Sequence, residues 1–327
     1  MEWKYIMISI LKLRSLFKNK INCENISEKT IEESNIISYY LPNFILHNYL
    51  DTSIKDRYLI VLTGTALGDY AGSDMEGYTR FENFTKKDKK LYSKYGACTD
   101  DTILTCATLE TILTGNDFSN IYRKYVRKYP NPHGGYGLHF VEWGNKDSMG
   151  PYNSCGNGSA MRVSPCGCLN QIEDVINIAY QSACVTHNHP EGIKGAIVTA
   201  VCIWLAFHGA SKEDILNYGI KYYPREEYPY SPELSYEQLL KIFPLKTSPA
   251  LCQLSVPLAI RCFYESENYE DCIRKAIKFG YDTDTQAAIA GSIAAAFYQE
   301  FSDESQNVFA DIKNETFIKE NLLLLNE

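Results

Sequence analysis

The segment Thr99-Asp100-Asp101-Thr102 is matched about 180 residues later by Asp282-Thr283-Asp284-Thr285. Each segment combines carboxylate and hydroxyl oxygens, and each comes just before a strongly apolar run. Because Thr or Asp before such a run is typical of a helix start, each cluster is predicted to open a buried helix. The two clusters therefore predict several hard oxygen ligands at helix N-termini, an arrangement that suits Mg²⁺-like cations.

The residues after each cluster support this placement. Residues 102–110 form a nearly continuous apolar run, and Gly115 is predicted to end that helix. The second cluster follows Gly280, a predicted cap of the preceding helix, and leads into residues 286–296, where small side chains share one face. Since small side chains let another backbone approach closely, this second helix is predicted to be central and buried.

A simpler interpretation is that each acidic pair only caps its helix. It explains one cluster more easily than two hydroxyl-flanked clusters that both open apolar helices. Calcium binding of the EF-hand kind is not indicated, because the sequence has no Asp-x-Asp-x-Asp-Gly loop that ends in Glu. Capping and Mg²⁺ binding therefore both remain open at this point.

Composition limits the classes of function. The chain has 327 residues, of which 45% are hydrophobic, so it can bury a large core in one or two domains. Its net charge of −8 argues against stable nucleic-acid binding and against anionic membranes. The eleven cysteines show no zinc-binding pattern, and Cys166 and Cys168 are predicted to be buried small hydrophobes. We expect reduced thiols and a cytoplasmic protein.

Residues 1–54 contain no chemical motif and are predicted to form an appended helical segment that packs on the domain or on a partner. The apolar run at residues 5–11 precedes the positive charges, which is the wrong order for a secretory signal. No apolar run approaches the ~20 residues that span a bilayer, so we expect no transmembrane segment. A basic amphipathic contact with a membrane remains open. Residues 55–327 are predicted to form one domain, and the protein is expected to be a monomer.

Helical periodicity dominates this domain. Gly64, Gly68 and Gly72 recur every four residues, which suits a tightly packed helix. The alternative of a strand and phosphate loop has neither a Gly-x-Gly-x-x-Gly motif nor a Walker lysine. Glu76 follows just beyond the predicted helix end. Further helical patterns occupy residues 172–183, 193–204, 215–223 and 269–277. Alternating strands are not evident, so the predicted fold class is all-α, a compact multi-helix array.

Three polar, glycine-containing loops separate these helices, at residues 129–137, 150–162 and 186–192. In the second loop, Gly156 and Gly158 allow a concave nest of backbone N–H groups that suits a diphosphate, although a plain turn is equally compatible. Arg162 could instead form a structural ion pair. In the third loop we predict His187 to be hydrogen-bonding or substrate-facing and His189 to be structural.

Residues 58–299 resemble the ADP-ribosylglycohydrolase family, which includes the dinitrogenase reductase-activating glycohydrolase. The segments that match, in the family's order, are residues 64–76, 99–102, 156–163, 186–192 and 280–285. The resemblance implies an orthogonal all-α fold with two Mg²⁺ ions at its centre, which Mn²⁺ could replace. It also implies hydrolysis of the bond between ADP-ribose and an acceptor, with release of free ADP-ribose.

The resemblance also implies roles for single residues. The implied metal ligands are Thr99, Asp100, Asp101, Asp282, Asp284 and Thr285. The implied substrate-binding residues are Asn157, Gly158, Ser159 and His187. Glu76 matches a family acid near the metals and is our first choice for the general base, with Asp100 second. Tyr281 departs from the family pattern, which commonly has a second Gly there.

The implied chemistry is physically coherent. Two cations could chelate the ribose diol and orient a water molecule while a carboxylate takes its proton. Cleavage at an anomeric carbon passes through an oxocarbenium-like state that carboxylates stabilise. Two alternatives remain: an inactive ADP-ribose-binding or structural member of the same fold, and a phosphoesterase that releases AMP. The acceptor also stays open, since arginine, serine, a nucleic-acid base or a small molecule would each fit.

Overall fold

The computed structural model describes residues 35–42, 52–77, 90–243 and 250–327. In these ranges the regular structure is helical, and the only strand-like features are isolated bridges from Thr99 to His133 and from Gly156 to Leu251. The predicted all-α fold class is confirmed. The predicted extension over residues 1–54 lies mostly outside the described residues, and its role stays a prediction.

The described helices are connected mainly by short loops. In chain order they are α2 (Ile36–Tyr40), α3 (Ile54–Ser73), α4 (Asp100–Thr114), α5 (Phe118–Lys128), α6 (Leu138–Asn145), α7 (Gly158–Met161), the 3₁₀ helix η2 (Ser164–Cys168), α8 (Ile172–Cys184), α9 (Pro190–Phe207), α10 (Lys212–Tyr222), α11 (Tyr236–Ile242), α12 (Cys252–Glu265), α13 (Tyr269–Ile277), α14 (Thr283–Tyr298), α15 (Asp303–Ile312) and α16 (Thr316–Leu324).

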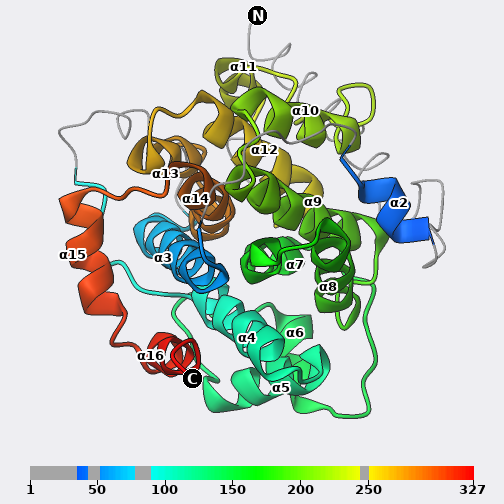
Figure 1. The fold of residues 1–327 in the computed structure, drawn as a ribbon, viewed down its shortest axis with the longest axis vertical. Helices are drawn as coiled ribbons and strands as arrows, with labels where there is room; N and C mark the ends of the chain where they lie inside the picture. The colour runs from blue at the N-terminus through cyan, green and yellow to red at the C-terminus, as the bar shows by residue number, and fades with distance from the viewer. Residues whose placement is uncertain (1–34, 43–51, 78–89, 244–249) are drawn as a thin grey trace, which may run out of the picture. The chain divides into compact units, whose positions relative to one another are not determined.

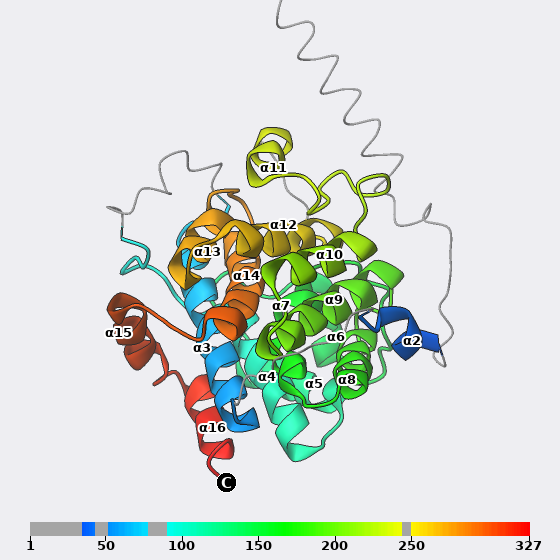
Figure 2. The same cartoon turned by 45° about the horizontal axis from the view of Figure 1, so that its top comes forward.

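Helices α3 and α14 lie side by side in the middle of the helical array (Figures 1 and 2). Their backbones nearly touch: a Cβ atom placed on Gly68 would lie 2.3 Å from the carbonyl oxygen of Ala287. One placed on Gly72 would lie 2.4 Å from the carbonyl oxygen of Thr283. All α14 residues from Thr283 to Ala296 are buried. The glycine spacing of α3 and the central position of α14 are both as predicted.

Two predicted helix ends can be compared with the structure. Helix α4 ends at Thr114 with Gly115 in the left-handed conformation (φ 67°), as expected. Helix α13 ends earlier than predicted, with Lys278 as its C-cap. The prediction that Gly280 caps α13 is therefore wrong. Gly280 instead has a φ of 81° and turns the chain into the second acidic cluster.

The other periodic segments form helices where expected. Helix α9 begins with Pro190, and α10 is preceded by Ser211 in a capping box. Helix α9 is apolar and long enough to span a membrane by composition, but 83% of it is buried inside the fold, as in a core helix. All cysteines of the described chain are free, and Cys166 and Cys168 are fully buried as predicted.

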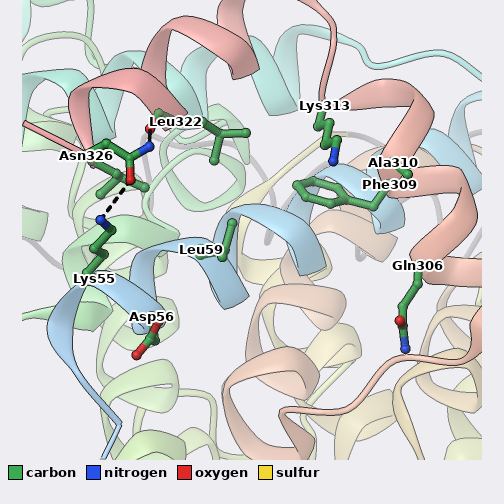
Figure 3. A pocket seen from close by; sticks show the side chains of 10 residues that line it. Lys55, Asp56, Leu59, Gln306, Phe309, Ala310, Lys313, Leu322 and Asn326 are labelled. Atoms are coloured by element: carbon green, nitrogen blue, oxygen red, sulfur yellow. Dashed lines mark hydrogen bonds between the residues drawn. The ribbon is translucent and has the colours of Figure 1, made fainter.

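The C-terminal helices α15 and α16 pack at the edge of the array, against α3 and α4 respectively (Figure 1). A pocket of about 350 Å³ lies where α3 meets α15 and α16, with Leu59, Phe309 and Leu322 among its apolar lining (Figure 3). Lys55 donates a hydrogen bond to Asn326 across its edge, at 2.8 Å. The C-terminus is thereby tied to the start of α3.

Candidate metal centre

Three helices bring carboxylates together at one buried point. Asp69 comes from α3, Asp101 from the first turn of α4 and Asp284 from the first turn of α14. Each offers an oxygen within 4.8 Å of the others, and all three residues are buried. The two acidic clusters, far apart in sequence, thus meet beside the close contact of α3 with α14.

The carboxylates of the two acidic clusters cap neither α4 nor α14. Helix α4 is capped by the hydroxyl of Thr99, which accepts a hydrogen bond from the Asp101 N–H at 3.2 Å. Asp282 occupies the N-cap of α14 but makes no side-chain cap hydrogen bond. Helix capping therefore does not account for the carboxylates of Asp101 and Asp282.

Direct contacts join the clusters. The Thr285 hydroxyl donates to Oδ2 of Asp101 at 3.2 Å, and the Thr285 N–H donates to Oδ1 of Asp284 at 2.9 Å. Oδ1 of Asp101 is buried and has no hydrogen-bond partner among the described residues. Because an unpaired buried carboxylate oxygen is costly, this atom indicates a place for a cation.

Asp69 was not identified from the sequence. Its oxygens accept hydrogen bonds from the N–H and hydroxyl of Thr99, both at 2.8 Å, and from the N–H and hydroxyl of Thr102, at 3.1 and 2.5 Å. It therefore holds the start of α4 against α3. A signal was present in the sequence: Asp69 is a carboxylate inside the small, apolar Gly64–Gly72 helix, and buried charges need a polar partner.

The electrostatics of the centre favour a cation. Burial raises the pKa of Asp69 to about 6, against the opposing effect of its four hydrogen bonds. Burial, together with neighbouring carboxylates, also raises the pKa of Asp100, Asp101 and Asp284 well above the ordinary value. No ion pair in the described chain involves these residues. The described residues therefore supply no positive partner for them.

Glu76 stands beyond the end of α3 and is exposed. Partial desolvation and the charge of Asp282 raise its pKa, while His133 opposes this rise. The next residue, Gly77, donates its N–H to the carbonyl of Tyr281 at 2.7 Å. Glu76 is thereby held beside the second acidic cluster, at the solvent side of the centre.

Asn157 and Ser159, from the predicted loop at residues 150–162, are held by hydrogen bonds within the protein. Nδ2 of Asn157 donates to Oδ2 of Asp282 at 2.5 Å and to the Ser255 hydroxyl at 2.9 Å. The Ser159 hydroxyl is fully buried and donates to the Gly192 carbonyl at 2.8 Å. The Nδ2 hydrogens of Asn157 and the hydroxyl hydrogen of Ser159 are thus already donated to protein acceptors, which leaves the backbone and Oδ1 of Asn157 for contact with a ligand. Their predicted substrate role stays a prediction.

His187 packs against the glycine of this loop. A Cβ atom on Gly158 would lie 3.1 Å from Nε2 of His187, so the glycine leaves room for the ring. The Thr186 hydroxyl lies 2.7 Å from the other ring nitrogen and accepts a hydrogen bond from Arg162 at 2.8 Å. Burial and the Arg162 charge hold the pKa of His187 well below its usual value, so the imidazole is neutral.

Arg162 and His189 lie in the same two predicted loops. Arg162 is buried and takes part in no ion pair of the described chain, so the alternative of a structural ion pair finds no support there. Its guanidinium instead lies over the Tyr122 ring at 4.2 Å and orders Thr186. His189 has the structural role expected of it, because its Nδ1 caps α9 at the N–H of Glu191.

Comparison with known proteins extends these observations. The family model described as ADP-ribosylglycohydrolase matches residues 50–301. The chain is 28% identical to the ADP-ribosylhydrolase ARH3 of Homo sapiens over 309 residues, covering 74% of this chain and 85% of that protein. It is 24% identical over 274 residues to the ADP-ribosylarginine hydrolase Tri1 of Pseudomonas putida (strain GB-1), covering 74% and 71% respectively.

A solved structure shares the fold. The match, titled "ADP-ribosylglycohydrolase-related protein complex", has a TM-score of 0.65 and 23% sequence identity. It covers 84% of this chain and 98% of that chain. The arrangement of helices therefore has a counterpart in a known protein.

Proposed function

The chain belongs to the ADP-ribosylglycohydrolase family, and from this premise we propose that it hydrolyses the glycosidic bond between ADP-ribose and an acceptor in a Mg²⁺-dependent reaction. The products are free ADP-ribose and the unmodified acceptor. The observation that supports this most is that the two acidic clusters meet, through Asp101 and Asp284, at one buried point beside Asp69. We further propose that the protein acts as a cytoplasmic monomer.

The donor set suits hard cations. Asp101 has a buried carboxylate oxygen without a partner, and no described cation neutralises the cluster. We assign two Mg²⁺ ions, replaceable by Mn²⁺, to Thr99, Asp100, Asp101, Asp282, Asp284 and Thr285. Asp69 already accepts four hydrogen bonds, so its role is to position Thr99 and Thr102.

Bound Mg²⁺ would hold the ribose hydroxyls beside the scissile bond and make a bound water more acidic. Glu76 has a raised pKa and lies at the solvent side of the centre, which suits a group that takes a proton from water. The water oxygen forms a bond to the anomeric carbon while the bond from that carbon to the acceptor breaks. The acceptor leaves with the proton that Glu76 took from the water, so Glu76 returns to its carboxylate form. Asp100 is the alternative base.

The surrounding residues position the substrate. Asn157 fixes one oxygen of Asp282 and so keeps that carboxylate oriented toward the centre. The neutral His187, packed against Gly158, can hydrogen-bond a phosphate of the ADP-ribose. We propose that the backbone of Asn157, Gly158 and Ser159 lines the same phosphates.

A panel of ADP-ribosylated acceptors tests the activity directly. Arginine-, serine-, base- and small-molecule-linked ADP-ribose would each be incubated with the protein, with Mg²⁺ or with a chelator. Chromatography should show free ADP-ribose from at least one linkage, in the Mg²⁺ arm only. AMP as product would indicate a phosphoesterase instead, and tight ADP-ribose binding without turnover would indicate an inactive binding protein.

A further inference from the structure

A second pocket lies near the N-terminal end of α3, away from the acidic centre. It has a volume of about 470 Å³, and its lining includes Arg57, Asn170, Gln171, Glu173, Trp204 and His208. Arg57 and Asp69 both lie on α3, so the rise of the helix places them about 18 Å apart along its axis. The pocket is therefore separate from the proposed metal site.

Arg57 is the charged group of this pocket. Only 7% of the residue is exposed. Its Nε donates to the Thr52 carbonyl at 3.0 Å, and Nη1 makes a long contact of 3.5 Å with Oδ1 of Asn170. In the described chain it pairs with no carboxylate, and its Nη2 has no hydrogen-bond acceptor. The guanidinium carbon lies 5.7 Å from the centre of the Phe207 ring, and Nη2 is not among the buried polar atoms that lack a partner. Nη2 is therefore open to the solvent of the pocket, where it can donate to an external anion.

The start of α8 faces the same pocket. Gln171 is its N-cap, and no side chain makes a cap hydrogen bond there. The N–H groups of the first turn and the helix dipole favour a negative group at this end. Glu173, which is exposed, is the one carboxylate of the lining and opposes anion binding. Trp204 and His208 stack at 4.0 Å and form a flat wall.

We propose that this pocket binds a small molecule through an oxyanion, a phosphate or carboxylate group, which Arg57 recognises with help from the N-terminus of α8. The volume of about 470 Å³ exceeds that of the oxyanion alone, so the pocket has room for a small organic part beside Trp204. This site does not depend on the proposed glycohydrolase activity.

The test is anion binding to the full chain without metal. Inorganic phosphate and malonate would be titrated by calorimetry at constant ionic strength, with chloride as the reference salt. We expect saturable binding of at least one of them. Arg57→Gln should weaken this binding by about tenfold or more, the size of a charge-assisted hydrogen bond. Glu173→Gln, which removes the opposing charge, should strengthen it about twofold to fivefold.

Further variants distinguish anion binding in this pocket from binding at the acidic centre, and loss of the pocket's binding from a folding defect. Asp101→Asn should bind the anion as the parent does. If Arg57→Gln does not fold, Glu173→Gln at the exposed position still tests the proposal, because this variant is expected to bind the anion more strongly than the parent does. Absence of saturable binding to either anion overturns the proposal, as does equal binding by folded Arg57→Gln and the parent. A clear change of anion affinity in Asp101→Asn, above all stronger binding after loss of the negative charge, would place the anion at the acidic centre and likewise overturn the proposal.

Discussion

Replacing Gly68 by Ala tests the contact between α3 and α14 that brings the acidic clusters together. The added Cβ would lie 2.3 Å from the carbonyl oxygen of Ala287 and 2.7 Å from its carbonyl carbon. Ordinary contact begins at 3.4 Å, and both opposing atoms belong to the backbone. The two helices must therefore separate by about 1 Å to accept the methyl group.

Two effects of opposite sign decide the outcome. Ala is favoured over Gly in a helix interior by about 1 kcal/mol. Overpacking a well-packed core costs about 1–3 kcal/mol, and a backbone clash that moves a whole helix belongs at the upper end or beyond. Separation also loosens the neighbouring contacts at Gly64 and Gly72. We expect Gly68→Ala to lower the free energy of unfolding by about 2 kcal/mol.

Urea unfolding of the parent and the variant measures this difference. Gly150→Ala is the matched control, because a Cβ at Gly150 meets no atom within 4 Å. The control should match the parent or exceed it slightly, through the smaller entropy of its unfolded chain. If Gly68→Ala is as stable as the parent, the two helices do not pack as closely as described.

Three further predictions concern the site and the thiols. Because folding raises the pKa of Asp69 from 3.8 to about 6 and that of Asp101 upward, the folded chain holds more protons, so the stability of the metal-free protein should fall as pH rises through this window. Thermal unfolding at pH 5 and pH 7.5 checks this, and Mg²⁺ should remove most of the difference. Asn157→Ala, which removes the hydrogen bond to Asp282, should lower Mg²⁺ affinity about 10- to 100-fold in calorimetry, while Ser255→Ala should change it little. Strong reductant should leave the melting temperature unchanged, because the described cysteines are free; a drop of many degrees would reveal a disulfide.

Local patterns in the sequence predicted the positions of many of the helices. The spacing of Gly64, Gly68 and Gly72 indicated a tightly packed helix, and the structure brings α14 onto that face. Capping residues and apolar periodicity placed α4, α9 and α10, since both signals depend on neighbours in the sequence. The meeting of the two acidic clusters followed from the resemblance to a family and from their shared composition.

Contacts between distant side chains could not be predicted in this way. Asp69 holds Thr99 across 30 positions of sequence, and Asn157 holds Asp282 across 125. Such pairs leave no periodicity or cap signal, because either residue alone is compatible with many neighbours. Arg162 shows the same limit: an ion pair was one alternative for it, but its guanidinium meets a tyrosine ring and hydrogen-bond acceptors from α8 and the loop after it.

The most direct measurement is the rate of ADP-ribose release by the parent, Asp101→Asn, Asp282→Asn and the double variant, together with calorimetric Mg²⁺ binding. Asn keeps an oxygen that could cap, and Asp282 makes no cap hydrogen bond, so a capping role predicts near-parent rates. A shared metal centre predicts Mg²⁺-dependent release by the parent and loss by orders of magnitude in all three variants. The losses should be far from additive, because one break already disables the centre. Full activity in either single variant, or in the thoroughly chelated parent, would contradict the metal centre and the proposed function with it.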